Sequence, residues 1–350
     1  MFVISSVAIT ITVATAIYWY VNRHKPVKHL LSEARYFLDM QGAGAGGLID
    51  DWISVRWNKI ELPDAKNKIA VITGGARGIG TEVVRGLLKS NVTVIMGVRN
   101  PDSVKSMAKS MENGDKIHAY KLDLQSLKSV KDFADNVLER FPEIDLLVNN
   151  AGIMFGDYKL TEDGFETQLA VNHLSHFYLT HLLLPALKKG GKVDPARVVS
   201  VSSCGHYPGK IYFDDINMKE HYNTTAAYAQ SKLAQIMTAR YLNRLFQQNN
   251  YPVKCYSVHP GIVDTDLFEK SNFAKFPFIK KLLFKTPEKG AVTVLYACFN
   301  NEILKQGGLY IANCKAGFSN RFSKNEKHQE KLFKLSCELV GIDAEKFGMC

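Results

Sequence analysis

The sequence predicts an α/β fold in which helices cover both faces of one parallel, doubly wound sheet. Short runs rich in Val and Ile alternate with segments whose apolar residues recur at helical spacing. A glycine-rich turn joins the first such run to the first helical segment. Strands that alternate with helices favour a parallel sheet with crossover helices, and 350 residues suit one large domain with accessory segments.

The first strand, turn and helix are predicted in "KIAVITGGARGIGTEVVRGLL". Gly74, Gly78 and Gly80 allow the backbone to turn tightly and to approach a pyrophosphate. The N-terminus of the following helix, beside Arg77 and Ile79, adds N–H groups and the positive end of its dipole. This unit predicts a Rossmann-type binding site for a dinucleotide.

The second strand, "VTVIMGVRN", sets the expected choice of dinucleotide. An NAD-binding protein usually places Asp or Glu at the end of this strand, where the carboxylate holds the ribose 2′-hydroxyl. This chain has Arg99 there. Arg99 and Arg77 would together attract a 2′-phosphate, so NADP(H) is favoured over NAD(H). If both arginines are merely solvated, NAD(H) stays open.

Three more elements continue the alternation: a strand in "HAYKLDL", a helix in "VKDFADNVLERF" and a strand in "IDLLVNNAG". Asp123 lies near the end of the first strand, and Asn150, Ala151 and Gly152 close the second. Ligands of open α/β sheets bind at the carboxyl ends of the strands. These residues are therefore expected to contact the adenine and other parts of the cofactor, although spacing alone equally allows turn residues.

Residues 1–22 are predicted to form a transmembrane anchor. The stretch from Phe2 to Val21 carries no charge, has the length of about 20 residues that crosses a bilayer, and ends in aromatic residues followed by a basic cluster. The positive-inside rule then places the N-terminus in the lumen and the body of the chain in the cytosol. A cleaved signal peptide lacks support, because no basic region precedes the apolar run. A segment lying on the membrane surface is the other alternative.

The remaining chain divides into a linker and a domain. Residues 23–65 carry the run "GAGAGG" together with Trp52 and Trp57, and are expected to be a flexible linker with a short amphipathic piece. Residues 66–350 are expected to form the α/β domain. The net charge of +10 is not gathered on one DNA-reading helix, so no nucleic-acid partner is expected. Six cysteines without C-x-x-C or metal-ligand spacing predict neither a disulfide framework nor a metal site.

Six motifs stand in order along the chain: "TGGARGIG", "NNAG", "NHLSHF", "VVSVSS", "YAQSK" and "HPGIVDTDL". Together they resemble those of the short-chain dehydrogenase/reductase family over about residues 66–345, and the chain is similar to its retinol-dehydrogenase-like branch. "LLFKTPEKGA" and "CELVGI" are most similar to a member of this branch that acts on polyisoprenoid alcohols and aldehydes. The resemblance implies an NAD(P)-dependent oxidoreductase acting on CH–OH groups.

The resemblance also implies a catalytic set. Tyr228 matches the family's general acid/base, and Lys232, four residues later, matches the lysine that supports it and donates to the nicotinamide ribose. A neighbouring ammonium should lower the pKa of the phenol from its ordinary value of about 10. Ser203 matches the serine that hydrogen-bonds the substrate oxygen, and Asn172 the residue that supports a water-linked proton relay. Ser202 would project to the opposite face of the strand.

Further positions follow from the same resemblance. Pro260 and Gly261 match the turn beside the nicotinamide, and Thr265 matches a contact to its carboxamide. Ser175 departs from the Gly that the branch often has, and the glycine loop reads "GGAR" where many relatives have an Asn. The stretch from Leu267 to Lys285, dense in Phe, Leu and Lys, matches a mobile lid over the substrate; otherwise it is a core helix with a solvated lysine face.

The sequence as a whole predicts a single-pass enzyme of the endoplasmic reticulum membrane, with the lipid droplet or outer mitochondrial membrane as alternatives. It would interconvert a lipophilic alcohol, such as a retinoid or a polyprenol or dolichol, and its carbonyl form with NADP(H). An NAD-dependent steroid or other lipid alcohol dehydrogenase is one alternative, and a non-catalytic membrane scaffold is an alternative of another class. The exact substrate, the direction of the reaction and the oligomeric state, a homodimer among the options, stay open.

Two alternatives concern the catalytic set itself. Tyr228 and Lys232 could be a solvated pair on an ordinary helix, because residues four apart share a helix face. A serine hydrolase could use Ser203 with His206 or His259, but the chain has no G-x-S-x-G elbow.

Overall fold

The computed structural model of the chain describes residues 26–54, 58–268 and 283–347. Eight strands form one sheet in the order β3-β2-β1-β4-β5-β6-β7-β8. All neighbours are parallel except β7 and β8. The strands are β1 (Ile69–Thr73), β2 (Thr93–Val98), β3 (Ile117–Lys121), β4 (Leu146–Asn149), β5 (Ala196–Val201), β6 (Val253–His259), β7 (Tyr310–Ala312) and β8 (Lys315–Ala316). The order reverses between β1 and β4, which confirms the predicted doubly wound, Rossmann-type sheet.

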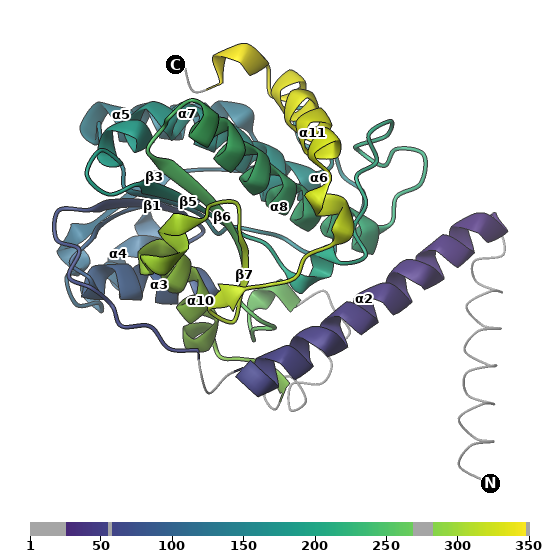
Figure 1. Cartoon of the computed structure of the whole chain (residues 1–350), viewed down its shortest axis with the longest axis horizontal. Coiled ribbons are helices and arrows are strands. Elements are labelled where there is room, and N and C mark those ends of the chain that lie inside the picture. Colours follow the sequence, from purple (N-terminus) through teal and green to yellow (C-terminus); the bar gives the residue numbers. More distant parts are fainter. Residues whose placement is uncertain (1–25, 55–57, 269–282, 348–350) are drawn as a thin grey trace, which may run out of the picture.

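Helices cover both faces of this sheet (Figure 1). One face carries α3 (Gly78–Lys89), α4 (Asp102–Lys109) and α10 (Pro287–Phe299). The other face carries α5 (Leu127–Arg140), α7 (Ser175–Gly190), α8 (Thr224–Gln248) and α11 (Glu326–Leu339). Two apolar cores therefore sandwich the sheet, and the buried strands need apolar residues on both faces, which explains their continuous Val and Ile runs.

Short helical segments connect the main elements. They are α6 (Thr167–Leu169), the π-helical segment η2 (Ala170–Leu174), and the 3₁₀ segments η1 (Gly114–Lys116), η3 (Cys204–His206), η4 (Asp266–Phe268), η6 (Glu302–Lys305), η7 (Arg321–Lys324) and η8 (Ala344–Lys346). Two of them matter for the site: η2 precedes α7, and η3 follows β5 at the carboxyl edge of the sheet.

The predicted flexible linker is largely a helix. Residues 27–54 form α2 (Val27–Ser54), a helix of 28 residues that runs through the whole glycine run and lies along the outside of the sandwich (Figure 1). Glycine lowers helix propensity by about 1 kcal/mol relative to alanine, so packing against the domain has to compensate. Leu30 and Asp51 of α2 are buried by such packing. The prediction of a flexible linker was wrong because it rested on helix propensity alone, which does not include these tertiary contacts.

The predicted anchor, residues 1–22, lies outside the described residues. Among the helices that are described, none is long and apolar enough to cross a membrane. The predicted lid also falls mostly outside the described ranges, except for its two ends.

Candidate active site

The glycine-rich turn after β1 forms a cradle at the carboxyl edge of the sheet. Gly74 and Gly78 have φ angles of +67° and +57°, which side chains other than glycine rarely adopt. A methyl group on Gly80 would lie 2.2 Å from the carbonyl oxygen of Gly74, so only glycine fits there. The turn leads directly into the N-terminus of α3, whose free N–H groups and dipole favour an anion. This geometry fits the pyrophosphate of a dinucleotide.

The end of β4 holds this turn in place. Asn150 Nδ2 donates to the carbonyl oxygens of Thr73 and Gly74 at 2.9 and 3.1 Å. The backbone N–H groups of Asn150 and Ala151 donate to Thr73 Oγ1, which also contacts His176 Nε2 at 2.8 Å. Sequence reasoning predicted Asn150 and Ala151 but missed Thr73 and His176. The Thr that ends β1, directly before the glycine turn, was the available signal for the first of them.

The two predicted arginines lie on the surface beside the cradle. Arg99 is exposed, and the Arg77 guanidinium forms an exposed ion pair with Asp266 at 3.4 Å. The prediction that Arg77 and Arg99 together attract a 2′-phosphate did not include a nearby acid, but η4 brings Asp266 next to Arg77 from a distant part of the sequence. Asp123 at the end of β3 accepts a hydrogen bond from Gln125 N at 3.0 Å, so it also shapes a turn.

Tyr228 and Lys232 lie on the inner face of α8. Their exposed fractions are 3% and 4%, so the alternative of a solvated pair is wrong. The hydroxyl of Ser203 hydrogen-bonds the side chain of Tyr228 and accepts from Gly205 N at 3.1 Å. A methyl group on Gly205 would lie 2.9 Å from the Tyr228 ring, so glycine lets the ring sit against η3. Ser202 instead donates to the carbonyl oxygen of Lys232 at 2.8 Å, away from this cluster, as predicted from strand alternation.

Asn172 lies behind this cluster in the π-helical segment η2, a rare helix type that often occurs at functional sites. Its side chain is fixed on both sides: Oδ1 accepts from Ile153 N at 2.9 Å, and Nδ2 donates to Ser231 Oγ at 2.9 Å. A methyl group on Gly152 would lie 3.3 Å from both Asn172 Oδ1 and Lys232 Nζ. The structure therefore brings Asn172 and Lys232 together around Gly152.

Burial is the main cause of the pKa shifts of Tyr228 and Lys232. Desolvation raises the pKa of Tyr228 well above its ordinary value, and the hydrogen bond from Ser203 lowers it in part. Desolvation also lowers the pKa of Lys232 to about 7. The prediction that Lys232 lowers the pKa of Tyr228 is therefore wrong for this structure. The Lys232 ammonium donates to the carbonyl oxygen of Val201 at 2.9 Å, and its Nζ lies 5.7 Å from the centre of the Tyr228 ring.

One cavity of about 1530 Å³ joins the glycine cradle to this cluster. Every residue predicted to bind the cofactor lines it: Gly74, Arg77, Gly78, Ile79, Gly80, Arg99, Asp123, Asn150, Ala151, Gly152, Tyr228, Lys232, Pro260, Gly261 and Thr265. Ser203 lines it too. The volume exceeds the about 300–1,000 Å³ of a typical small-ligand pocket, so it has room for a dinucleotide and a second molecule.

The same cavity has walls that sequence reasoning missed. Six residues of α2 line it, namely Phe37, Met40, Gln41, Gly44, Ala45 and Leu48. Phe155 adds to this wall, and Leu267, Phe268 and Phe284 line the cavity from the two described ends of the predicted lid. The spacing of Phe37, Met40, Gly44 and Leu48 is helical and could have signalled one face of a helix, but the glycine run concealed it.

The geometry does not support a serine hydrolase. His206 uses Nδ1 to contact the backbone oxygen of Ser203 at 2.6 Å and Nε2 to accept from Asn320 N. His259 Nδ1 accepts from Cys204 N at 3.2 Å. Burial lowers the pKa of His206 to about 3 and that of His259 to about 4. The described contacts of both rings go to other partners, and the Ser203 hydroxyl hydrogen-bonds Tyr228 instead.

Comparison with known proteins gives the same family as the motifs. The profile of the short chain dehydrogenase family matches residues 68–275. The chain belongs to this family and is an NAD(P)-dependent oxidoreductase with one Rossmann-type domain.

Similar proteins of known name indicate the branch of the family to which the chain belongs. Polyprenol dehydrogenase of Danio rerio is 40% identical over 290 residues, which cover 81% of this chain and 89% of that protein. Retinol dehydrogenase 12 of Bos taurus is 38% identical, covering 79% and 87%. The crystal structure of an uncharacterised protein from Mycobacterium paratuberculosis is 33% identical, covers 81% of this chain and 97% of that one, and superposes with a TM-score of 0.68. The predicted retinol-dehydrogenase-like branch is confirmed.

Proposed function

We propose that this chain transfers a hydride between NADP(H) and a lipophilic alcohol/carbonyl pair, such as a retinoid or a polyisoprenoid. The observation that carries the proposal is the shared cavity: Ser203, Tyr228 and Lys232 line the space that the glycine cradle also lines. The names of the relatives, a polyprenol dehydrogenase and a retinol dehydrogenase, support a lipophilic substrate. The apolar wall of the cavity supports it as well, because an apolar substrate gains by leaving water.

In the proposed mechanism Tyr228 is the general acid/base. A nicotinamide held at the cradle end of this cavity would supply or accept the hydride. During reduction the Tyr228 hydroxyl donates a proton to the carbonyl oxygen, and the Ser203 hydroxyl hydrogen-bonds the same oxygen; oxidation reverses both steps. The raised pKa of Tyr228 keeps its hydroxyl protonated at neutral pH, so the proton that reduction consumes is present on it. Because the pKa of Lys232 is about 7, part of the protein molecules carry a charged Lys232 at neutral pH. The charged form stabilises the Tyr228 phenolate.

Asn172 is proposed to position the set rather than to touch substrate. Its amide joins η2 to Ile153 beside the cavity and to Ser231 on α8. It lies beside Lys232 across Gly152, where it supports the proposed proton relay. The buried hydrogen bonds on both ends of the amide hold this arrangement without needing the ligand.

The preference for NADP(H) over NAD(H) rests on Arg77 and Arg99. Both line the cavity beside the cradle, and guanidinium groups bind phosphate through charge-assisted hydrogen bonds. Asp266 pairs with Arg77 and weakens its part of this preference, so Arg99 carries more of the argument. An NAD-dependent dehydrogenase of a steroid or another lipid alcohol is the alternative.

We also propose that residues 1–22 anchor the protein and that the domain of residues 66–350 faces the cytosol at the endoplasmic reticulum. Support comes from α2, which follows the proposed anchor. Large apolar side chains of α2 are exposed at helical spacing, including Val27, Leu31, Leu38, Ile49 and Trp52, the last with 81% of its surface exposed. Such an apolar stripe suits a membrane surface. Lipid droplets and the outer mitochondrial membrane are alternative sites.

The test is turnover in detergent micelles with NADPH and NADH, each offered retinal, a polyprenal and a steroid ketone. We expect turnover with a lipid aldehyde, faster with NADPH, that disappears in Tyr228→Phe and persists in Tyr207→Phe, whose hydroxyl donates to the carbonyl oxygen of Phe318 outside the cavity. No turnover on any of these, with cofactor binding demonstrated, would favour the non-catalytic scaffold. Equal rates in Tyr228→Phe and wild type would contradict the proposed acid/base.

A further inference from the structure

We infer that α2 is a wall of the substrate cavity and that Gly44 leaves open the path taken by a long apolar tail of the substrate. The inference rests on the proposed function and adds to it a residue that selects for tail length. The family profile begins at residue 68, after α2, so this wall lies outside the part of the chain that the family profile matches.

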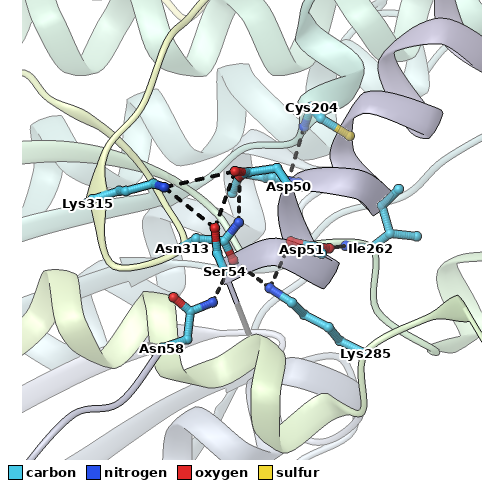
Figure 2. A network of polar contacts seen from close by, with 10 residues as sticks. Asp50, Asp51, Ser54, Asn58, Cys204, Ile262, Lys285, Asn313 and Lys315 are labelled. Carbon is cyan, nitrogen blue, oxygen red and sulfur yellow. Dashed lines mark hydrogen bonds and ion pairs between the residues drawn. The ribbon is translucent and has the colours of Figure 1, made fainter. Parts of the chain in front are cut away.

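The C-terminal end of α2 is fastened to the domain by a buried ion pair (Figure 2). Asp51 Oδ1 lies 2.8 Å from Lys285 Nζ, and Asp51 Oδ2 accepts from Ile262 N at 2.8 Å. Ile262 directly follows the Pro260–Gly261 turn beside the proposed nicotinamide site. A methyl group on Gly261 would lie 2.7 Å from Asp51 Oδ2, so glycine permits this approach. The carboxylate thus joins α2 to a turn that lines the cavity.

Further contacts fix the rest of α2. Asn313 joins the network by accepting from Lys285 Nζ at 2.7 Å and donating to Asp50 at 2.6 Å (Figure 2). One turn earlier, Leu48 packs on a cluster of Cys204, Ile262 and Phe284. Near the middle of the helix the hydroxyl groups of Tyr36 and Tyr212 lie 2.5 Å apart. Contacts at several levels along its length make α2 a fixed part of the domain.

The face of α2 that looks into the cavity is uncharged and is hollow at one point. Phe37, Met40, Gln41, Gly44, Ala45 and Leu48 contribute, and none of them is ionisable. Apart from the backbone of α2 itself, no atom of the described residues lies within 4 Å of the position that a Cβ on Gly44 would occupy, so the space next to it is open. The ionisable residues of the described lining come from other segments: Arg77, Arg99, Asp123, Lys232, Asp266, Tyr228, Cys204 and His259. This uncharged wall therefore fits the apolar hydrocarbon tail of a substrate.

Gly44→Leu tests the inference without weakening the helix. Leucine has a higher helix propensity than glycine, so the variant should not unfold α2, while its side chain would fill the open space. Gly46→Leu is the matched control. In the part of the chain that the structure describes, Gly46 likewise has no atom outside the α2 backbone within 4 Å of its Cβ position. It does not line the cavity, since two residues along a helix turn the side chain by about 200°.

The readouts are kcat/KM for geranylgeranial and for the five-carbon prenal, and the equilibrium binding of geranylgeraniol in micelles. A side chain placed in an apolar pocket discriminates by about 10- to 200-fold, so Gly44→Leu should lose about tenfold or more with the long aldehyde and in alcohol binding. It should keep wild-type activity on prenal, and Gly46→Leu should match wild type throughout. Equal binding of geranylgeraniol by both variants and wild type would overturn the inference, whatever the turnover. Absence of turnover in wild type, with binding lost only in Gly44→Leu, would instead count against the proposed function alone.

Discussion

The buried pair between Asp51 and Lys285 should control whether α2 stays docked. The side chains of Asp51 and Lys285 are 7% and 5% exposed, and their charged atoms lie 2.8 Å apart. Removing one partner of such a pair leaves a buried charge without its counter-ion, which destabilises by about 3–5 kcal/mol. In Asp51→Ala the Lys285 ammonium keeps its contact to Asn313 but loses the carboxylate, and Ile262 N loses its acceptor. We expect this loss to appear as undocking of α2.

The free energy lost in Asp51→Ala can be converted into a change in the population of molecules whose α2 is undocked. At 1.4 kcal/mol for each factor of ten, a loss of about 3–5 kcal/mol raises the open population of α2 by about 10²- to 4 × 10³-fold. Hydrogen exchange of amides in residues 27–54 measures this population directly. The double variant Asp51→Leu, Lys285→Met replaces both charges by apolar groups and should recover most of the protection, because a buried ion pair contributes little beyond an apolar pair.

The control is an ion pair on the same helix that water reaches. Arg35 and Asp39 are 3.5 Å apart with 83% and 47% of their side chains exposed, so Asp39→Ala should change exchange little. If Asp51→Ala leaves exchange of α2 unchanged, or changes it no more than Asp39→Ala, the reasoning about the buried pair is refuted.

Three further outcomes are expected. Arg99→Glu should lower the ratio of kcat/KM for NADPH to that for NADH by about 10- to 100-fold, because a charge-assisted hydrogen bond contributes about 1.5–3 kcal/mol; an unchanged ratio would remove Arg99 from the cofactor site. For carbonyl reduction, kcat/KM should fall as the pH rises through about 7, because Lys232 loses its proton there. The Lys232→Arg variant should be less active, but its kcat/KM should change less with pH because arginine stays charged. Burial lowers the pKa of His206 to about 3 and of His259 to about 4, so the unfolded chain binds more protons than the folded chain below about pH 6.5. The midpoint temperature of unfolding should therefore fall when the pH is lowered from about 7.5 to about 5.5, and it should fall less in His206→Gln.

The sequence predicted the sheet and the cofactor side well because their signals are local. The strand, glycine turn and helix around Gly74 to Gly80 follow one another within a few residues, and each local preference agrees with the fold. The Tyr228 and Lys232 pair was recognised by a spacing of one helical turn. Every predicted cofactor residue lines the cavity, since strand ends at the same edge of a parallel sheet converge.

The parts that the sequence did not predict depend on contacts between distant segments. The helix α2 runs through a glycine run whose intrinsic preference opposes it, so its contacts to the domain, among them those of Leu30, Leu48 and Asp51, have to stabilise it. The pairing of Asp51 with Lys285 carries no local signal. The Tyr228 pKa was expected to fall because Lys232 is its neighbour in sequence, whereas burial, which depends on packing, dominates.

The most direct test of the central claim is transfer of deuterium from NADPH labelled at both C4 positions to a lipid aldehyde in micelles, followed by mass spectrometry of the alcohol. The account predicts one deuterium on the former carbonyl carbon with wild type, and none above background with Tyr228→Phe although that variant still binds NADPH. Unlabelled alcohol from wild type, or full transfer by Tyr228→Phe, would contradict the assignment of this cavity as a hydride-transfer site with Tyr228 as its acid/base.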